Sequence, residues 1–141
     1  HEFNYGLPFL AQVTGTPISH EDLARHVCLV YTSVQGDERW QLRTPSGRPV
    51  AVPVHGPLRT NSLMALLDAA HAGMGIVTVP YCVAAGSIAA GRLRVVLPDY
   101  RLPDQEIHVV YPSPRRVPAP VQALVAWLQE RFPPRWWMAR G

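Results

Sequence analysis

Apolar positions are most regular between residues 56 and 80, where the spacing changes from helical to strand-like. Leucine and alanine recur three and four residues apart over 63–70, which predicts a helix with one apolar face. The Thr-Asn-Ser triplet at 60–62 precedes it and supplies side chains that accept hydrogen bonds from the first helical amides. Gly73 predicts a left-handed end to the helix, and the β-branched run 76–79 predicts a strand. We therefore expect turn, helix, tight turn and strand in this order.

The rest of the chain alternates between short apolar runs and breaks, many of them at its fifteen prolines. Trp40 and Leu42 alternate with polar residues and predict a half-buried strand, and three alternating valines predict the return strand of a hairpin. Helices are predicted from Pro8 to Gly15, from Ser19 (with a capping box to Asp22) to His26, over 81–90 and over 121–132. Further strands are predicted at 27–31, 93–97 and 107–111. This order of elements indicates an α/β fold.

The composition is that of one globular domain, with 141 residues, 48% hydrophobic and 16% charged. All thirteen basic residues are arginines scattered from Arg25 to Arg140, and the net charge is +3. A nucleic-acid-binding face needs clustered basic residues, so this distribution does not indicate one. No apolar run approaches the roughly 20 residues of a membrane span and no signal peptide is recognised, so we expect no membrane partner and a cytoplasmic location. Because the chain begins at His1 without an initiator Met, we expect a fragment of a longer protein.

Reactive side chains occur, but their spacing does not indicate an active site. None of the candidate nucleophiles and bases lies in a G-x-S-x-G elbow; they are Ser33, Cys28, Cys82, His26, His55 and His71. His20 and His26 do not have the spacing that places metal ligands on one helix face. The A-G-M-G turn follows a helix, whereas a phosphate loop follows a strand. We therefore expect no enzyme, no metal and no cofactor. Both cysteines are expected to be buried and inert, with a disulfide or redox switch as the alternative.

Polar residues end three of the predicted strands and indicate a ligand site. Parallel strands of an α/β sheet bring their carboxyl ends, and the helix starts that follow, to one edge where small ligands bind. The candidate effector-binding residues are Thr60, Asn61 and Ser62 at the helix start, Tyr31, Thr32 and Ser33 at a strand end, and Tyr81 after the next strand. Helix capping is the alternative role for the first group, and an ordinary strand exit is the alternative for the second.

Several phrases in a fixed order resemble the effector-binding domain of LysR-type transcriptional regulators. They run from DLARHVCLVY at 22–31 through TNS, LLDAAHAG, MGI and VTVP in the central stretch to GRLRVVLPDY at 91–100, and they end with IHVVYP and VQALVAWLQERF. The resemblance covers roughly residues 8–132. It implies an α/β fold of the type II periplasmic-binding-protein class, in which two subdomains are joined by crossing strands.

The resemblance also implies a domain organisation and a role. Residues 4–103 would form the second subdomain, residues 104–132 the strand and helix that return to the first, and 133–141 a tail. Most of the first subdomain and the winged helix-turn-helix would be absent, so DNA would be bound only through that missing domain. The implied function is sensing a small polar or anionic effector, and apolar faces left on 107–111 and 121–132 imply a homo-oligomer. A solute-binding protein of a transport system, which shares this fold, is the alternative.

Overall fold

The chain divides into two units, and a computed structural model describes each of them. It describes residues 2–5, 9–12, 17, 19–32, 39–103, 105–110 and 117–133. The larger unit is Leu7–Pro103, and the smaller consists of His1–Gly6 and Asp104–Gly141. The candidate ligand site predicted from the sequence belongs to the larger unit.

A five-stranded mixed sheet forms the centre of the larger unit. Its strand order is β6-β3-β7-β2-β8. β3 runs parallel to both β6 and β7, whereas β2 is antiparallel to β7 and β8. The strands that build it are β6 (Arg59–Thr60), β3 (Cys28–Tyr31), β7 (Ile76–Val79), β2 (Phe9–Gln12) and β8 (Arg94–Val96). The carboxyl ends of the three parallel strands therefore meet at one edge.

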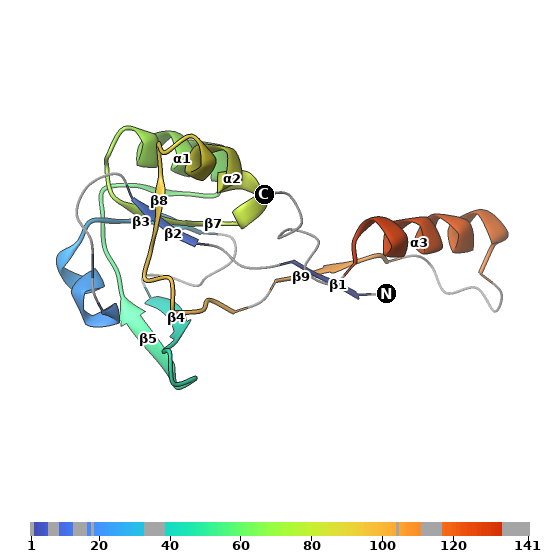
Figure 1. The fold of residues 1–141 in the computed structure, drawn as a ribbon, viewed down its shortest axis with the longest axis horizontal. Helices are drawn as coiled ribbons and strands as arrows, with labels where there is room; N and C mark the ends of the chain where they lie inside the picture. The colour runs from blue at the N-terminus through green and yellow to red at the C-terminus, as the bar shows by residue number, and fades with distance from the viewer. Residues whose placement is uncertain are drawn as a thin grey trace. The chain divides into compact units, whose positions relative to one another are not determined.

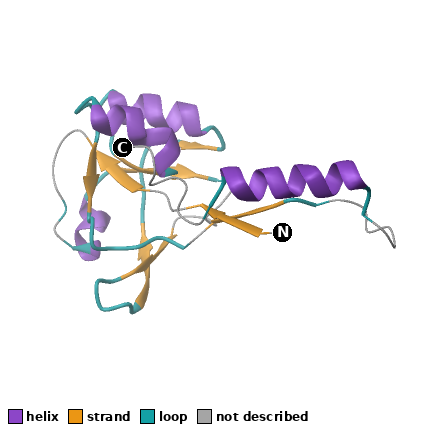
Figure 2. Ribbon diagram, turned by 45° about the vertical axis from the view of Figure 1, so that its right-hand side comes forward, coloured by secondary structure: helices purple, strands orange, loops and turns teal. Residues whose placement is uncertain are grey.

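The two faces of this sheet are covered by different elements, as Figure 1 and Figure 2 show. Helices α1 (Leu63–His71) and α2 (Tyr81–Ala89) cover one face, and the hairpin of β4 (Arg39–Arg43) and β5 (Pro49–Pro53) covers the other. Successive strand residues alternate between the faces, so Leu29 packs with the helices whereas Cys28 and Val30 pack with the hairpin. The continuous apolar run of β3 thus buries both of its sides.

The hairpin confirms the alternation predicted from the sequence. Trp40 and Leu42 of β4 are 1% and 2% exposed, while Arg39, Gln41 and Arg43 face solvent. Burying the Trp40 ring removes a large apolar surface from water and anchors the hairpin to the sheet.

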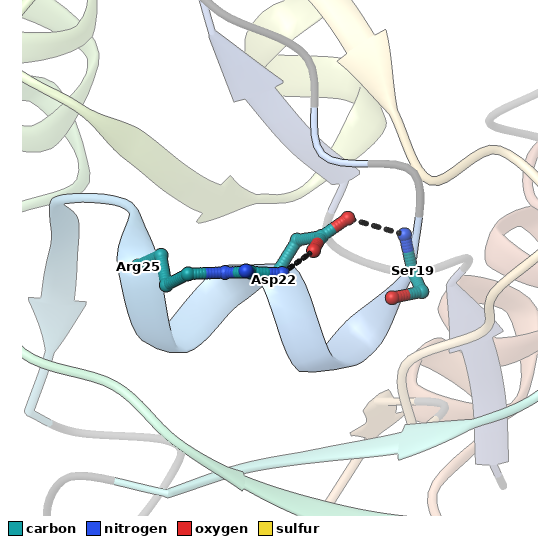
Figure 3. A network of polar contacts seen from close by, with 3 residues as sticks. All are labelled: Ser19, Asp22 and Arg25. Carbon is teal, nitrogen blue, oxygen red and sulfur yellow. Dashed lines mark hydrogen bonds and ion pairs between the residues drawn. The ribbon is translucent and has the colours of Figure 1, made fainter.

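A short 3-10 helix, η1 (His20–Arg25), packs its buried Leu23 into the same core as the hairpin. Figure 3 shows the contacts at its start: the Ser19 amide donates to the Asp22 carboxylate at 3.1 Å, and Asp22 also pairs with Arg25. The carboxylate therefore satisfies an amide at the helix start, as the predicted capping box requires.

The central stretch folds as predicted, from a capped helix start to a buried strand. Ser62 caps α1, and Gly73 follows the helix with a left-handed φ of 73°. Gly75 then approaches β3 so closely that an added Cβ would lie 2.5 Å from the Val27 carbonyl oxygen. His71 Nε2 and the Ser87 hydroxyl form a 2.8 Å hydrogen bond between α1 and α2, in which one group donates and the other accepts.

The smaller unit contains one strand pair and one helix in its described residues. β1 (Glu2–Tyr5) pairs antiparallel with β9 (Gln105–His108). Helix α3 (Ala119–Arg131) carries the predicted apolar stripe, but Leu124 and Trp127 of that helix are 52% and 50% exposed. None of the helices in the described ranges is long and apolar enough to cross a bilayer.

Three local predictions were wrong. The helix predicted from Pro8 is instead β2, because long-range pairing with β7 and β8 outweighs a local helix-start signal. The strand predicted at 107–111 starts at Gln105 and ends at His108. Cys82 is exposed on α2 rather than buried, since its place in the first helical turn faces away from the sheet.

We expect the two thiols to differ sharply in reactivity. Cys28 is fully buried, and burial raises the pKa of its thiol from 9.0 to about 12 because the thiolate loses its hydration. An aromatic disulfide reagent at pH 8 should therefore titrate one thiol in the native chain and two after denaturation. The Cys82→Ser variant is the control and should show no fast-reacting thiol. A native Cys28 that reacts as fast as Cys82 would contradict this packing.

The same burial predicts a loss of stability at alkaline pH. The folded-state pKa of Cys28 lies above its unfolded value, so its contribution to the free energy of unfolding is complete below pH 9 and falls as the pH rises toward 12. Urea unfolding of the native chain and of Cys28→Ala at pH 8 and pH 10.5 measures the effect. The difference in stability between the two chains should narrow at the higher pH.

Candidate functional site

The predicted polar residues lie at the carboxyl ends of adjacent parallel strands. Tyr31 at the end of β3 is the register partner of Thr60 at the end of β6. The Thr32 amide extends this pairing by donating to the Thr60 carbonyl at 3.0 Å. Tyr31 and Thr60 are half-buried, whereas Thr32 is exposed. The structure thus brings two separate segments of the predicted site together at one sheet edge.

The start of α1 is organised by hydrogen bonds within the Thr-Asn-Ser triplet. Ser62 Oγ accepts from the Ala65 amide at 3.2 Å, and Thr60 Oγ1 accepts from the Ser62 amide at 3.1 Å. The exposed Asn61 side chain makes no hydrogen bond to a described residue. The capping role that was the alternative is therefore real for Ser62, while Asn61 is left facing solvent.

Two backbone amides at this helix start are available to a ligand. The Ala65 and Leu66 amides are bonded to Ser62 through its hydroxyl and its carbonyl oxygen. No described residue accepts from the amides of Leu63 and Met64, and the first turn contains no acidic residue. These donors add to the positive end of the helix dipole. The sequence indicates a helix start that can present amides to a ligand, and the structure identifies these amides as those of Leu63 and Met64.

Tyr81 lies at the same edge through the neighbouring strand. β7 runs parallel to β3, ends at Val79, and continues through Pro80 into α2, whose first residue is the half-buried Tyr81. The starts of α1 and α2 therefore both follow strands that flank β3. Ser33, the remaining predicted residue, lies outside the described residues.

Two of the candidate catalytic residues, Cys28 and His71, have other roles in the described structure. Cys28 is buried with its thiol held neutral by its raised pKa, so it is a poor nucleophile. His71 shares its Nε2 with the hydroxyl of Ser87 at 2.8 Å, which links two helices. In the described part of the chain, no three His, Cys, Asp or Glu residues gather as metal ligands.

The fold is that of a LysR-type regulatory domain. The chain is similar to the regulatory domain of AphB from Vibrio vulnificus with a TM-score of 0.76 and 22% sequence identity. The similarity covers 92% of this chain and 67% of that structure. Such domains have the type II periplasmic-binding-protein-like fold, so the predicted fold class is confirmed.

Curated relatives are transcriptional regulators. An uncharacterised HTH-type transcriptional regulator of Haemophilus influenzae is 30% identical over 117 residues, which is 83% of this chain and 40% of that protein. The HTH-type transcriptional activator AaeR of Escherichia coli is 30% identical over 118 residues, or 84% of this chain and 38% of that protein. The chain thus spans about two fifths of the length of these relatives. Their names do not favour the alternative of a transport protein.

The family model described as the LysR substrate binding domain matches residues 8–133. This match includes the sheet, both helices that cover it, and every candidate residue at its carboxyl edge. Its range agrees with the one over which the resemblance was seen in the sequence. The chain therefore belongs to the LysR substrate-binding domain family.

Proposed function

We propose that this domain senses a small polar or anionic effector at the edge formed by β3, β6 and the start of α1. The observation that carries the proposal is the pair of Leu63 and Met64 amides, which have no acceptor among the described residues. Asn61 and Thr32 add exposed polar side chains beside them. A helix start of this kind favours negative charge or a strong hydrogen-bond acceptor.

Effector binding would act on gene expression through a DNA-binding domain elsewhere in the protein. The relatives are named HTH-type regulators, and we infer the same arrangement for the whole protein, in the cytoplasm where DNA is accessible. In this arrangement the Leu7–Pro103 unit is the second subdomain, and residues 104–132 belong with the first. Differential affinity of the effector for two conformations is what biases DNA binding. We propose sensing without catalysis, since the buried Cys28 thiol and the bonded His71 are not placed for it.

Substitutions at the start of α1 should separate ligand binding from helix capping. In the full-length regulator, Asn61→Ala should weaken the effector response about tenfold without loss of stability, because the side chain is exposed and makes no bond to a described residue. Ser62→Asp keeps a good cap but adds a negative charge, so it should impair the response to an anionic effector. A transcriptional reporter and thermal unfolding measure the two properties.

The control for these variants is Asp68→Asn, an exposed position on the same helix away from its start. It should leave the response unchanged. If Asn61→Ala and Ser62→Asp respond as the wild type does, the edge is only a structural helix start. If Ser62→Asp strengthens the response, the effector is a cation rather than an anion.

The isolated chain should not bind DNA with sequence selectivity. Its described helices are not arranged as a helix-turn-helix, and its arginines are dispersed. In a gel-shift assay with the regulator's own promoter, the full-length protein should give a specific complex and residues 1–141 should give none. A specific, salt-sensitive complex with residues 1–141 would refute this.

The chain should self-associate through the smaller unit. Val110, Leu124 and Trp127 expose large apolar side chains, at 86%, 52% and 50%. Covering these side chains in a dimer contributes about 25 cal/mol of favourable free energy for each Å² of apolar surface removed from water. Sedimentation at tens of micromolar should show a dimer, Leu124→Glu should shift it toward monomer, and Met64→Glu on α1 should not. A wild-type monomer at this concentration would contradict the prediction.

A further inference from the structure

A hollow of about 510 Å³ opens beside the turn between β4 and β5, within the larger unit. The hairpin covers the face of the sheet opposite to α1 and α2 (Figure 1), so this hollow is separate from the candidate effector edge. Its volume falls in the range of small-molecule sites. It is lined by Arg43, Thr44, Pro45, Gly47, Pro98, Asp99 and Arg101.

Backbone pairing places two of these arginines side by side. The Arg43 amide donates to the Arg101 carbonyl at 2.7 Å, and the Arg101 amide donates to the Arg43 carbonyl at 3.0 Å. Residues that exchange both bonds across an antiparallel bridge send their side chains to the same face. Leu42 and Leu102 are buried, so Arg43 and Arg101 both face solvent. Two positive charges are therefore neighbours on the outer face of the hairpin.

These charges have no carboxylate partner among the described residues. The Arg43 guanidinium donates to the Gly47 carbonyl at 3.2 Å, which holds it over the turn. Asp99 lines the hollow but forms no ion pair with either arginine. Like charges directly opposite each other across a strand pair are destabilising, and an anion between them would reverse the sign of that interaction.

We propose that this hollow is a second ligand site, which binds a small molecule through a phosphate or carboxylate group held between Arg43 and Arg101. Guanidinium groups match the geometry of such oxyanions with two parallel donors. Asp99 at the rim disfavours a polyanion, so the site selects a compact anion rather than a nucleic-acid backbone. The rest of the lining comes from the turn residues Thr44, Pro45 and Gly47 and from Pro98.

Titrations with inorganic phosphate and with succinate, followed by NMR amide shifts of the intact chain at low salt, test the site. Arg43→Gln and Arg101→Gln should each weaken binding about tenfold, because each removes a charge-assisted hydrogen-bond donor. Asp99→Asn should tighten binding, since it removes a negative charge from the rim. Arg39→Gln is the matched control: Arg39 is exposed on the same strand but does not line the hollow, and its loss should change nothing.

The outcomes distinguish specific binding of an anion in the hollow from non-specific electrostatic attraction to the protein. Binding of phosphate alone or of succinate alone supports the site and identifies which oxyanion it takes. If Arg39→Gln weakens binding as much as Arg43→Gln does, the anion responds to net charge and the proposal fails. It also fails if neither probe shifts amides around the β4–β5 turn, or if Asp99→Asn weakens binding. Thermal unfolding checks each variant, and Arg43→Gln alone decides the test if Arg101→Gln unfolds.

Discussion

The close approach of β3 to both of its parallel neighbours is the constraint on which the larger unit depends. Cys28 donates its amide to the His55 carbonyl at 2.9 Å on one side, and Val27 accepts from the Ile76 amide at 2.8 Å on the other. Gly56 and Gly75 stand at these two contacts, where an added Cβ would lie 2.0 Å from the Cys28 oxygen in β3 and 2.5 Å from the oxygen of Val27 just before it. Any side chain at either position would push a neighbouring strand away. The edge that gathers Tyr31, Thr60 and the helix starts exists because the strands begin in contact.

The elements that follow a local pattern were predictable, and those that depend on distant pairing were not. Trp40 and Leu42 alternate with polar residues because one side of β4 is buried, so the pattern reports burial directly. β2 shows the opposite case. Its position between β7 and β8 comes from pairing with residues far along the chain, and no local feature of the segment after Pro8 carries that information. For the same reason, the boundaries of β9 could not be placed from its own residues.

The two ligand regions illustrate the same limit. A Thr-Asn-Ser triplet before an amphipathic helix indicates a polar helix start without knowledge of the fold, so these residues could be named from the sequence. The triplet lies beside Tyr31 because β3 and β6 pair in parallel, with Tyr31 opposite Thr60. In contrast, Arg43 and Arg101 are distant in the sequence, and only the bridge between their backbones makes them neighbours. Dispersed arginines in a sequence therefore do not exclude a local pair of positive charges in the fold.

The hydrogen bond between His71 and Ser87 has a mechanical consequence. It ties the last residue of α1 to the buried side of α2 at 2.8 Å, while both helices share one apolar core. The bond joins the two helices near their C-terminal ends, so a tilt of one helix alone would strain or break it. A displacement at the start of one helix would therefore have to strain this bond and the shared core, or move the second helix as well.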